Sequence, residues 1–154
     1  MKILYFFLGL FIIAIILVVI ISMIEIRKLN IKSYTIQNKK IPKEFNGYKL
    51  ILMSDLHNCF YNNDRILQII NDEKPNCVVV AGDIMVYGEG SDETNFKSLD
   101  LIKDISELSD VYFSPGNHEM GYMLKNNNQW IKYEKYLLDS NNDNIYFLDN
   151  KKWK

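Results

Sequence analysis

Residues 48–57 read Tyr-Lys-Leu-Ile-Leu-Met-Ser-Asp-Leu-His, a short apolar run that ends in polar side chains. The same arrangement occurs at residues 77–83, Cys-Val-Val-Val-Ala-Gly-Asp, and at residues 111–119, Val-Tyr-Phe-Ser-Pro-Gly-Asn-His-Glu. Short apolar runs of this kind are typical of strands that are buried on both faces of a sheet. The three segments therefore predict three buried strands, each followed by a loop that carries polar groups.

The segments between these runs have the periodicity of amphipathic helices. Apolar residues form a helical stripe over residues 66–70, and a second stripe recurs every three residues over 96–108. A third helix is predicted around residues 130–138, and a fourth strand at residues 145–148. The resulting order, βαβαβαβ, predicts an α/β fold with a largely parallel sheet and helical crossovers.

Candidate metal ligands follow each of the three predicted strands. Asp55 and His57 follow the first strand, Asp83 the second, and Asn117 and His118 the third. Ligand sites in parallel sheets form beyond the carboxyl ends of the strands, so these side chains are expected to converge. In an extended segment residues i and i+2 point the same way, which would let Asp55 and His57 hold one ion. An Asp with a His suits Zn, Fe or Mn better than Mg or Ca.

Two glycines are predicted to turn the backbone at this edge. Gly82 would let the chain place the Asp83 carboxylate in the cleft, where its two oxygens could bridge two ions. Gly116 would permit the turn that presents Asn117, with its neutral carbonyl oxygen, and His118, as a proton donor or charge stabiliser.

Each of these pieces alone has a simpler explanation. An Asp-x-His pair is usually a surface loop, a Gly-Asp pair is a common turn, and a lone histidine after a strand is more often hydrogen-bonded structure. Their occurrence at three successive strand ends favours a metal site over coincidence.

The motifs Asp55-x-His57, Gly82-Asp83 and Gly116-Asn117-His118-Glu119 resemble the first three signature motifs of calcineurin-like metallophosphoesterases. The resemblance covers about residues 33–150, and the chain is most similar to the membrane-associated bacterial branch of that family. It implies an αββα sandwich and hydrolysis of phosphate esters by a two-metal site.

The resemblance also implies a role for each matching residue. Asp55 and His57 would hold the first ion, Asp83 would bridge both ions, and Asn117 would hold the second. His118 would be catalytic, protonating or stabilising the leaving oxygen of a phosphoester substrate. The implied cofactors are two divalent transition-metal ions, of Mn, Fe or Zn.

The chain has fewer candidate metal ligands than the family pattern requires. The family site also uses histidines from later motifs, whereas this chain has two histidines, both already assigned. The chain is therefore expected to be a truncated or split form, the N-terminal half of the family domain, and to hold one ion weakly. A chain that carries the missing half, or a second copy in a dimer, could complete the site. Two alternatives remain: a membrane-tethered metal- or phosphate-binding protein without turnover, and an unrelated α/β module with coincidental motifs.

Residues 3–24 contain no charged side chain and would form a helix of about 33 Å, enough to cross a bilayer. A cleaved signal peptide is the main alternative, but the run is long and no Ala-x-Ala-like site follows it, which favours a retained membrane anchor. A buried core helix of this length rarely suits so small a domain. Positive residues flank the run on both sides, so its orientation stays open.

The expected organisation is an anchor at residues 1–26, a tether with one short strand at residues 27–45, and a partial phosphoesterase domain at residues 46–154. The short strand is predicted from the alternation Tyr-Thr-Ile at residues 34–36. The net charge is -1 and no basic face is visible, so nothing indicates nucleic-acid binding. Two cysteines, Cys59 and Cys77, form neither a metal-type pair nor a disulfide framework.

Overall fold

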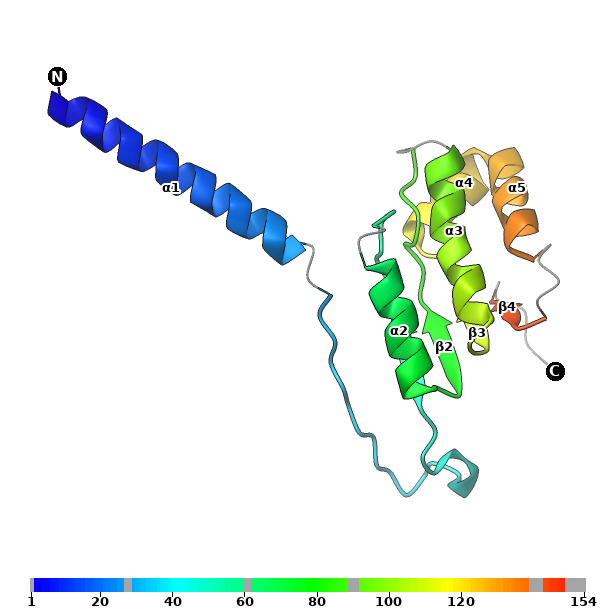
Figure 1. Cartoon of the computed structure of the whole chain (residues 1–154). Helices are drawn as coiled ribbons and strands as arrows, with labels where there is room; N and C mark the ends of the chain where they lie inside the picture. The colour runs from blue at the N-terminus through cyan, green and yellow to red at the C-terminus, as the bar shows by residue number, and fades with distance from the viewer. Residues whose placement is uncertain (1, 27–28, 60–61, 89–91, 139–142, 149–154) are drawn as a thin grey trace. The chain divides into compact units, whose positions relative to one another are not determined.

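A computed structural model describes the chain in five stretches, residues 2–26, 29–59, 62–88, 92–138 and 143–148. The chain divides into two compact units, Met1–Ile36 and Gln37–Lys154. Each unit is described by itself (Figure 1). The division falls inside the segment that was predicted to be a tether.

The first unit is dominated by one helix, α1 (Lys2–Ile26). Its segment Tyr5–Glu25 is long and apolar enough to cross a membrane, and none of its most apolar window is buried. A signal sequence near an N-terminus meets the same criteria, so length and composition alone do not decide between the two. The predicted strand at residues 34–36 is wrong: these residues form no strand, and Tyr34 and Ile36 are both exposed. Three alternating residues cannot hold an extended segment in place without a neighbouring strand.

The second unit alternates strands and helices as the sequence predicts. Its elements are, in chain order, the 3-10 helix η1 (Lys43–Phe45), β1 (Leu50–Met53), α2 (Asn63–Glu73), β2 (Cys77–Val80), α3 (Asp92–Ser106), β3 (Val111–Phe113), α4 (Asn117–Lys125), α5 (Asn127–Leu138) and β4 (Ile145–Phe147). The four strands form one sheet in the order β1-β2-β3-β4, and every neighbouring pair is parallel. The α/β fold class is therefore confirmed.

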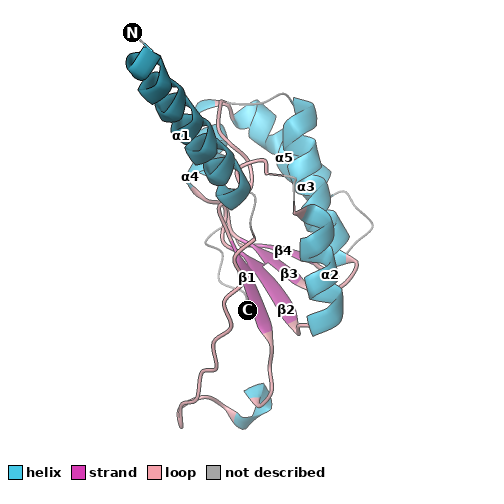
Figure 2. Cartoon of the chain, turned by 60° about the vertical axis from the view of Figure 1, so that its left-hand side comes forward, coloured by secondary structure: helices cyan, strands magenta, loops and turns pink. Residues whose placement is uncertain are grey.

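The helices α2, α3 and α5 lie on one side of the sheet (Figure 2). The strand residues that face the core are fully buried, among them Val78, Val80 and Phe113. On the opposite face, by contrast, Leu50 is 53% and Leu52 66% exposed. The core of the described residues therefore lies between the sheet and its helical layer. The described residues do not include the second sheet of the expected sandwich.

The structure adds one helix that the sequence pattern did not predict. The Gly-Asn-His-Glu segment was predicted to be a turn, yet α4 begins at Asn117, so that Asn117 and His118 occupy its first turn. Only Glu119 and Tyr122 of α4 are buried, which leaves little apolar periodicity to detect. As a result, the third crossover from β3 to β4 consists of two helices, α4 and α5, rather than one.

Candidate metal centre

The loops after β1 and β2 are joined by backbone hydrogen bonds beyond the ends of the strands. The Asp55 N–H donates to the Gly82 carbonyl at 3.1 Å, and the His57 N–H donates to the Asp83 carbonyl at 3.0 Å. These bonds continue the parallel pairing of β1 with β2 into the loops. The predicted ligands on the two loops are therefore held side by side.

Three predicted ligands form a compact group at this edge of the sheet. Asp55, His57 and Asp83 each offer one ligand atom, and these atoms all lie within 4.8 Å of one another. His57 Nε2 lies 3.7 Å from Asp55 Oδ1. Asp55 and His57 are exposed and Asp83 is half-buried, so the group is open to solvent on one side.

The backbone that brings these ligands together is left-handed, not extended. The φ angles are +58° at Asp55, +49° at His57 and +55° at Asp83, and Asn58 beside His57 has +57°. The argument that Asp55 and His57 converge because they are i and i+2 in a strand was therefore wrong, although the two side chains do meet. Positive φ is uncommon outside glycine, and its concentration at one site is typical of a functional site whose surroundings hold it in place.

The two glycines act in different ways. Gly82 has φ +79°, and a side chain there would also collide with the Gly116 backbone. Gly116 has an ordinary extended backbone, with φ -89° and ψ -168°, so it does not supply the sharp turn that was predicted. Instead, a Cβ at Gly116 would collide with the Asp83 backbone and carboxylate, so glycine is required there to admit a ligand loop.

The start of α4, which follows the loop after β3, contacts Asp83 directly. The His118 N–H in the first turn of α4 donates to Asp83 Oδ1 at 2.9 Å. One carboxylate oxygen thus has a protein partner, which orients the side chain and leaves Oδ2 free of any described hydrogen bond. Asn117 is exposed at the first residue of α4.

The His118 imidazole lies beside the ligand group. Its ring stands edge-on to the ring of His57, with centroids 4.9 Å apart and an interplanar angle of 89°. The Tyr87 N–H donates to His118 Nδ1 at 2.9 Å, so a neutral imidazole carries its proton on Nε2. His118 therefore has a hydrogen-bond donor at Nε2.

Glu119 holds two loops together through its side chain, a role that the sequence motif did not reveal. Its side chain is completely buried. Oε2 accepts the N–H groups of Asp83 and Gly116, both at 2.8 Å. Oε1 accepts those of Ile84 at 3.0 Å and Met85 at 3.1 Å. One carboxylate thus ties the loop after β2 to the start of α4, and its position three residues after Gly116 is the one available sequence signal.

The donor set fits one transition-metal ion. Two carboxylates and one imidazole can supply three ligands to an open site, and an Asp–His set favours Zn, Fe or Mn. A second ion at the same edge would share Asp83, with Asn117 as a further candidate ligand. Together with the parallel sheet, these loops define an α/β protein whose candidate metal ligands lie at the carboxyl ends of its strands.

A comparison of the sequence with models of protein families shows which family this α/β protein belongs to. The family model described as calcineurin-like phosphoesterase matches residues 48–153, which is more than half of the chain. The chain therefore belongs to the calcineurin-like phosphoesterase family, whose members are generally hydrolases that act on phosphoesters with divalent metals. A search of curated proteins gave no match to the chain.

Replacing Glu119 by Gln is expected to destabilise the second unit by about 3 kcal/mol or more, because an amide NH2 would face N–H donors that now bond to a carboxylate oxygen. Chemical denaturation followed by circular dichroism measures the change. The control is Glu107→Gln, at an exposed position just after α3, which should change stability by no more than about 0.5 kcal/mol. Equal, small effects of both substitutions would contradict the assignment.

Proposed function

We propose that the chain supplies the ligands of the first ion in a two-metal phosphoesterase site. The observation that carries the proposal is the grouping of Asp55, His57 and Asp83 within 4.8 Å, with the ring of His118 beside them. The substrate class is a phosphate ester. Membership of the calcineurin-like phosphoesterase family supports the reaction type, and the ligand geometry supports these residues as its metal ligands.

Each residue has a distinct part in this proposal. Asp55 and His57 would hold the first ion, and Asp83, oriented by the His118 N–H, would be shared between the two ions. Bound divalent ions neutralise phosphate charge and lower the pKa of a water. His118 is proposed as the catalytic residue, because its Nε2–H can donate to an oxygen of the substrate as negative charge develops there.

Asn117 is the proposed protein ligand of the second ion besides Asp83. These two side chains offer fewer ligands than a tight site needs. Both histidines of the chain are already assigned, so further imidazole ligands would have to come from another segment or a partner chain. The same shortage favours a second candidate function: a metal- or phosphate-binding protein without turnover.

The first test is metal binding by the 154-residue chain in detergent. Titration with Mn²⁺, followed by electron paramagnetic resonance, is expected to show one weak site. Asp83→Ala should lower its affinity by more than about tenfold, since a direct ligand matters at least as much as the groups that support it. The matched control is Asp64→Ala, which removes an exposed carboxylate on α2 and should leave binding unchanged. Equal affinities of all three proteins would reject the ligand assignment.

Turnover by the purified chain is expected to be low. Two-metal catalysis requires both ions at a fixed separation, and the second ion has too few protein ligands here. Hydrolysis of an aryl phosphate and an aryl phosphodiester with added Mn²⁺ measures this. Robust turnover that His118→Ala abolishes would show that this chain completes the site by itself, contrary to the proposal.

We also propose that residues 3–24 anchor the protein in a membrane. The support is the long, uncharged helix α1, whose most apolar window is not buried. The proposed organisation is an anchor at residues 1–26, a tether at 27–45, and the partial phosphoesterase domain at 46–154. This location would make a phosphoester at a membrane surface an accessible substrate.

Carbonate extraction of cell membranes tests the anchor. The chain is expected to stay in the membrane pellet with its N-terminus intact, because a retained apolar helix is not removed by high pH. Recovery in the soluble fraction, with the first residues missing by mass spectrometry, would identify a signal peptide instead.

A further inference from the structure

The loop that carries His57 is tied to helix α3 by one side chain. Asn58 follows His57 directly and has a left-handed backbone, with φ +57°. Its Oδ1 accepts the Ser98 hydroxyl at 2.6 Å, and its Nδ2 lies 3.4 Å from Asn95 Oδ1. The two partners are 3% and 1% exposed, so the Asn58 amide reaches into the interior beside α3.

Asn95 is itself held in one orientation. Its NH2 group donates to the hydroxyls of Tyr122 at 3.0 Å and Tyr133 at 2.9 Å. Both amide hydrogens are therefore used, and the carbonyl oxygen must face Asn58. The Tyr122 hydroxyl lies 3.2 Å from the Val86 carbonyl, on the segment that follows Asp83. The same amide thus connects to the loops after β1 and β2.

The outer end of this network is fixed by charge. The Tyr133 hydroxyl donates to Asp92 Oδ1 at 2.8 Å. Hydrogen bonds from Lys132, Tyr133 and Gln129 lower the pKa of Asp92 to about 2, so it is ionised under ordinary conditions. Burial raises the pKa of Tyr133 to about 12, which keeps its hydroxyl a donor. The donors of the network therefore point toward Asp92: Asn58 donates to Asn95, Asn95 to Tyr133, and Tyr133 to Asp92.

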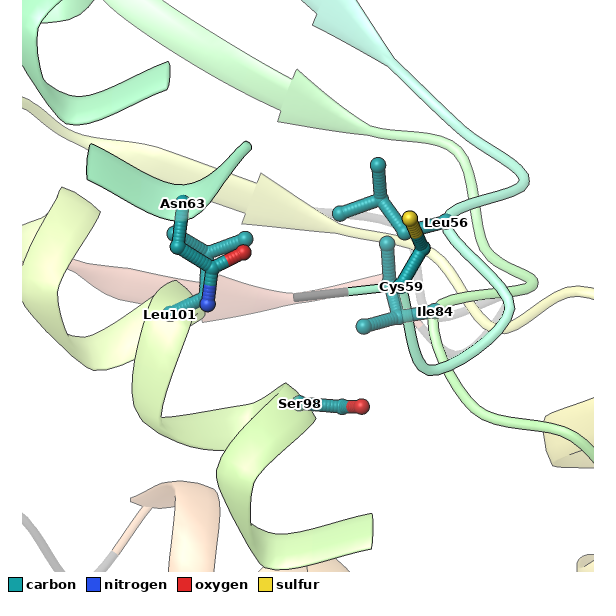
Figure 3. A pocket seen from close by; sticks show the side chains of 6 residues that line it. All are labelled: Leu56, Cys59, Asn63, Ile84, Ser98 and Leu101. Carbon is teal, nitrogen blue, oxygen red and sulfur yellow. The ribbon is translucent and has the colours of Figure 1, made fainter. Parts of the chain in front are cut away.

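The Asn58 backbone N–H also donates to the Ile84 carbonyl at 2.8 Å, whereas the side chains around Ser98 are mostly apolar. Ser98 projects from α3 into a small pocket toward the side where Leu56 and Cys59 lie (Figure 3). Apart from Ser98 and Asn63, the pocket lining is Leu56, Cys59, Ile84 and Leu101. Contacts with such side chains are non-directional and do not select one backbone conformation. Hydrogen bonds to the Asn58 amide are directional, so they can.

We propose that Asn58, Ser98 and Asn95 are positioning residues that hold the His57 loop in its left-handed, metal-ready conformation. The inference rests on the proposed metal site: these three side chains would set the affinity of that site for its ion. Without these hydrogen bonds, the loop would sample conformations in which His57 points away from Asp55 and Asp83. Metal affinity would fall because ion binding would then have to order the loop.

The test is Mn²⁺ titration of the 154-residue chain in detergent, with melting temperatures measured without metal. Ser98→Ala and Asn58→Gly should each lower the affinity about tenfold, as loss of a group that supports a ligand does. Glycine is chosen at position 58 because it tolerates the left-handed backbone. Ser98→Thr keeps the hydroxyl and should keep the affinity. The double substitution should lose little more than either single one, since both remove the same contact.

The matched control is Ser106→Ala. Ser106 is also buried on α3, but its hydroxyl donates to the Lys103 carbonyl of the same helix. This variant should bind Mn²⁺ like the unsubstituted chain, even if its melting temperature falls as much as that of Ser98→Ala. Should Ser98→Ala fail to fold, Asn58→Gly decides the question alone.

Affinities of Asn58→Gly and folded Ser98→Ala equal to that of the unsubstituted chain would overturn the inference and leave the metal site standing. An equal loss in Ser106→Ala would likewise overturn it, because the effect would then be one of general stability. Absence of Mn²⁺ binding by the unsubstituted chain would overturn the proposed function and this inference together.

Discussion

The geometry of the candidate metal centre depends on the Glu119 carboxylate and on the four backbone N–H groups that donate to it. A completely buried carboxylate is costly unless its charge is satisfied, and these four donors, from the loop after β2 and from Gly116, satisfy it. The arrangement also places a negative charge in the first turn of α4, where the helix dipole favours it. Because the loop and the helix share this one acceptor, Asp83 is positioned to receive the His118 N–H.

The side chains that support the site come from two helices, α3 and α4. Glu119 belongs to α4, and Asn95 and Ser98 belong to α3, whereas Leu52 on the other face of the sheet is 66% exposed. The described contacts hold the loops after β1 and β2 through the Glu119 carboxylate, the Asn58 amide and the backbone hydrogen bonds between the two loops. What limits the site is the number of ligands for a second ion.

The strands and the ligand positions could be predicted because their signals are local. Runs such as Cys77–Val80 combine β-branched residues with a polar stop, and parallel strands must end at a common edge. The backbone at Asp55 could not be predicted, since the left-handed conformation of a non-glycine residue leaves no mark in the sequence. Helix α4 was missed because it buries only two residues, and the importance of Glu119 was missed because backbone N–H groups belong to no sequence pattern.

Two loops bring Asp55, His57 and Asp83 together, and we propose that these three side chains hold one transition-metal ion. Crystals of the chain soaked in Mn²⁺, with diffraction measured at the manganese absorption edge, test it most directly. We expect an anomalous difference peak at coordination distance from all three side chains, which disappears in crystals of Asp83→Ala. A peak bound to other residues, or none in soaked crystals of the unsubstituted chain, would contradict it.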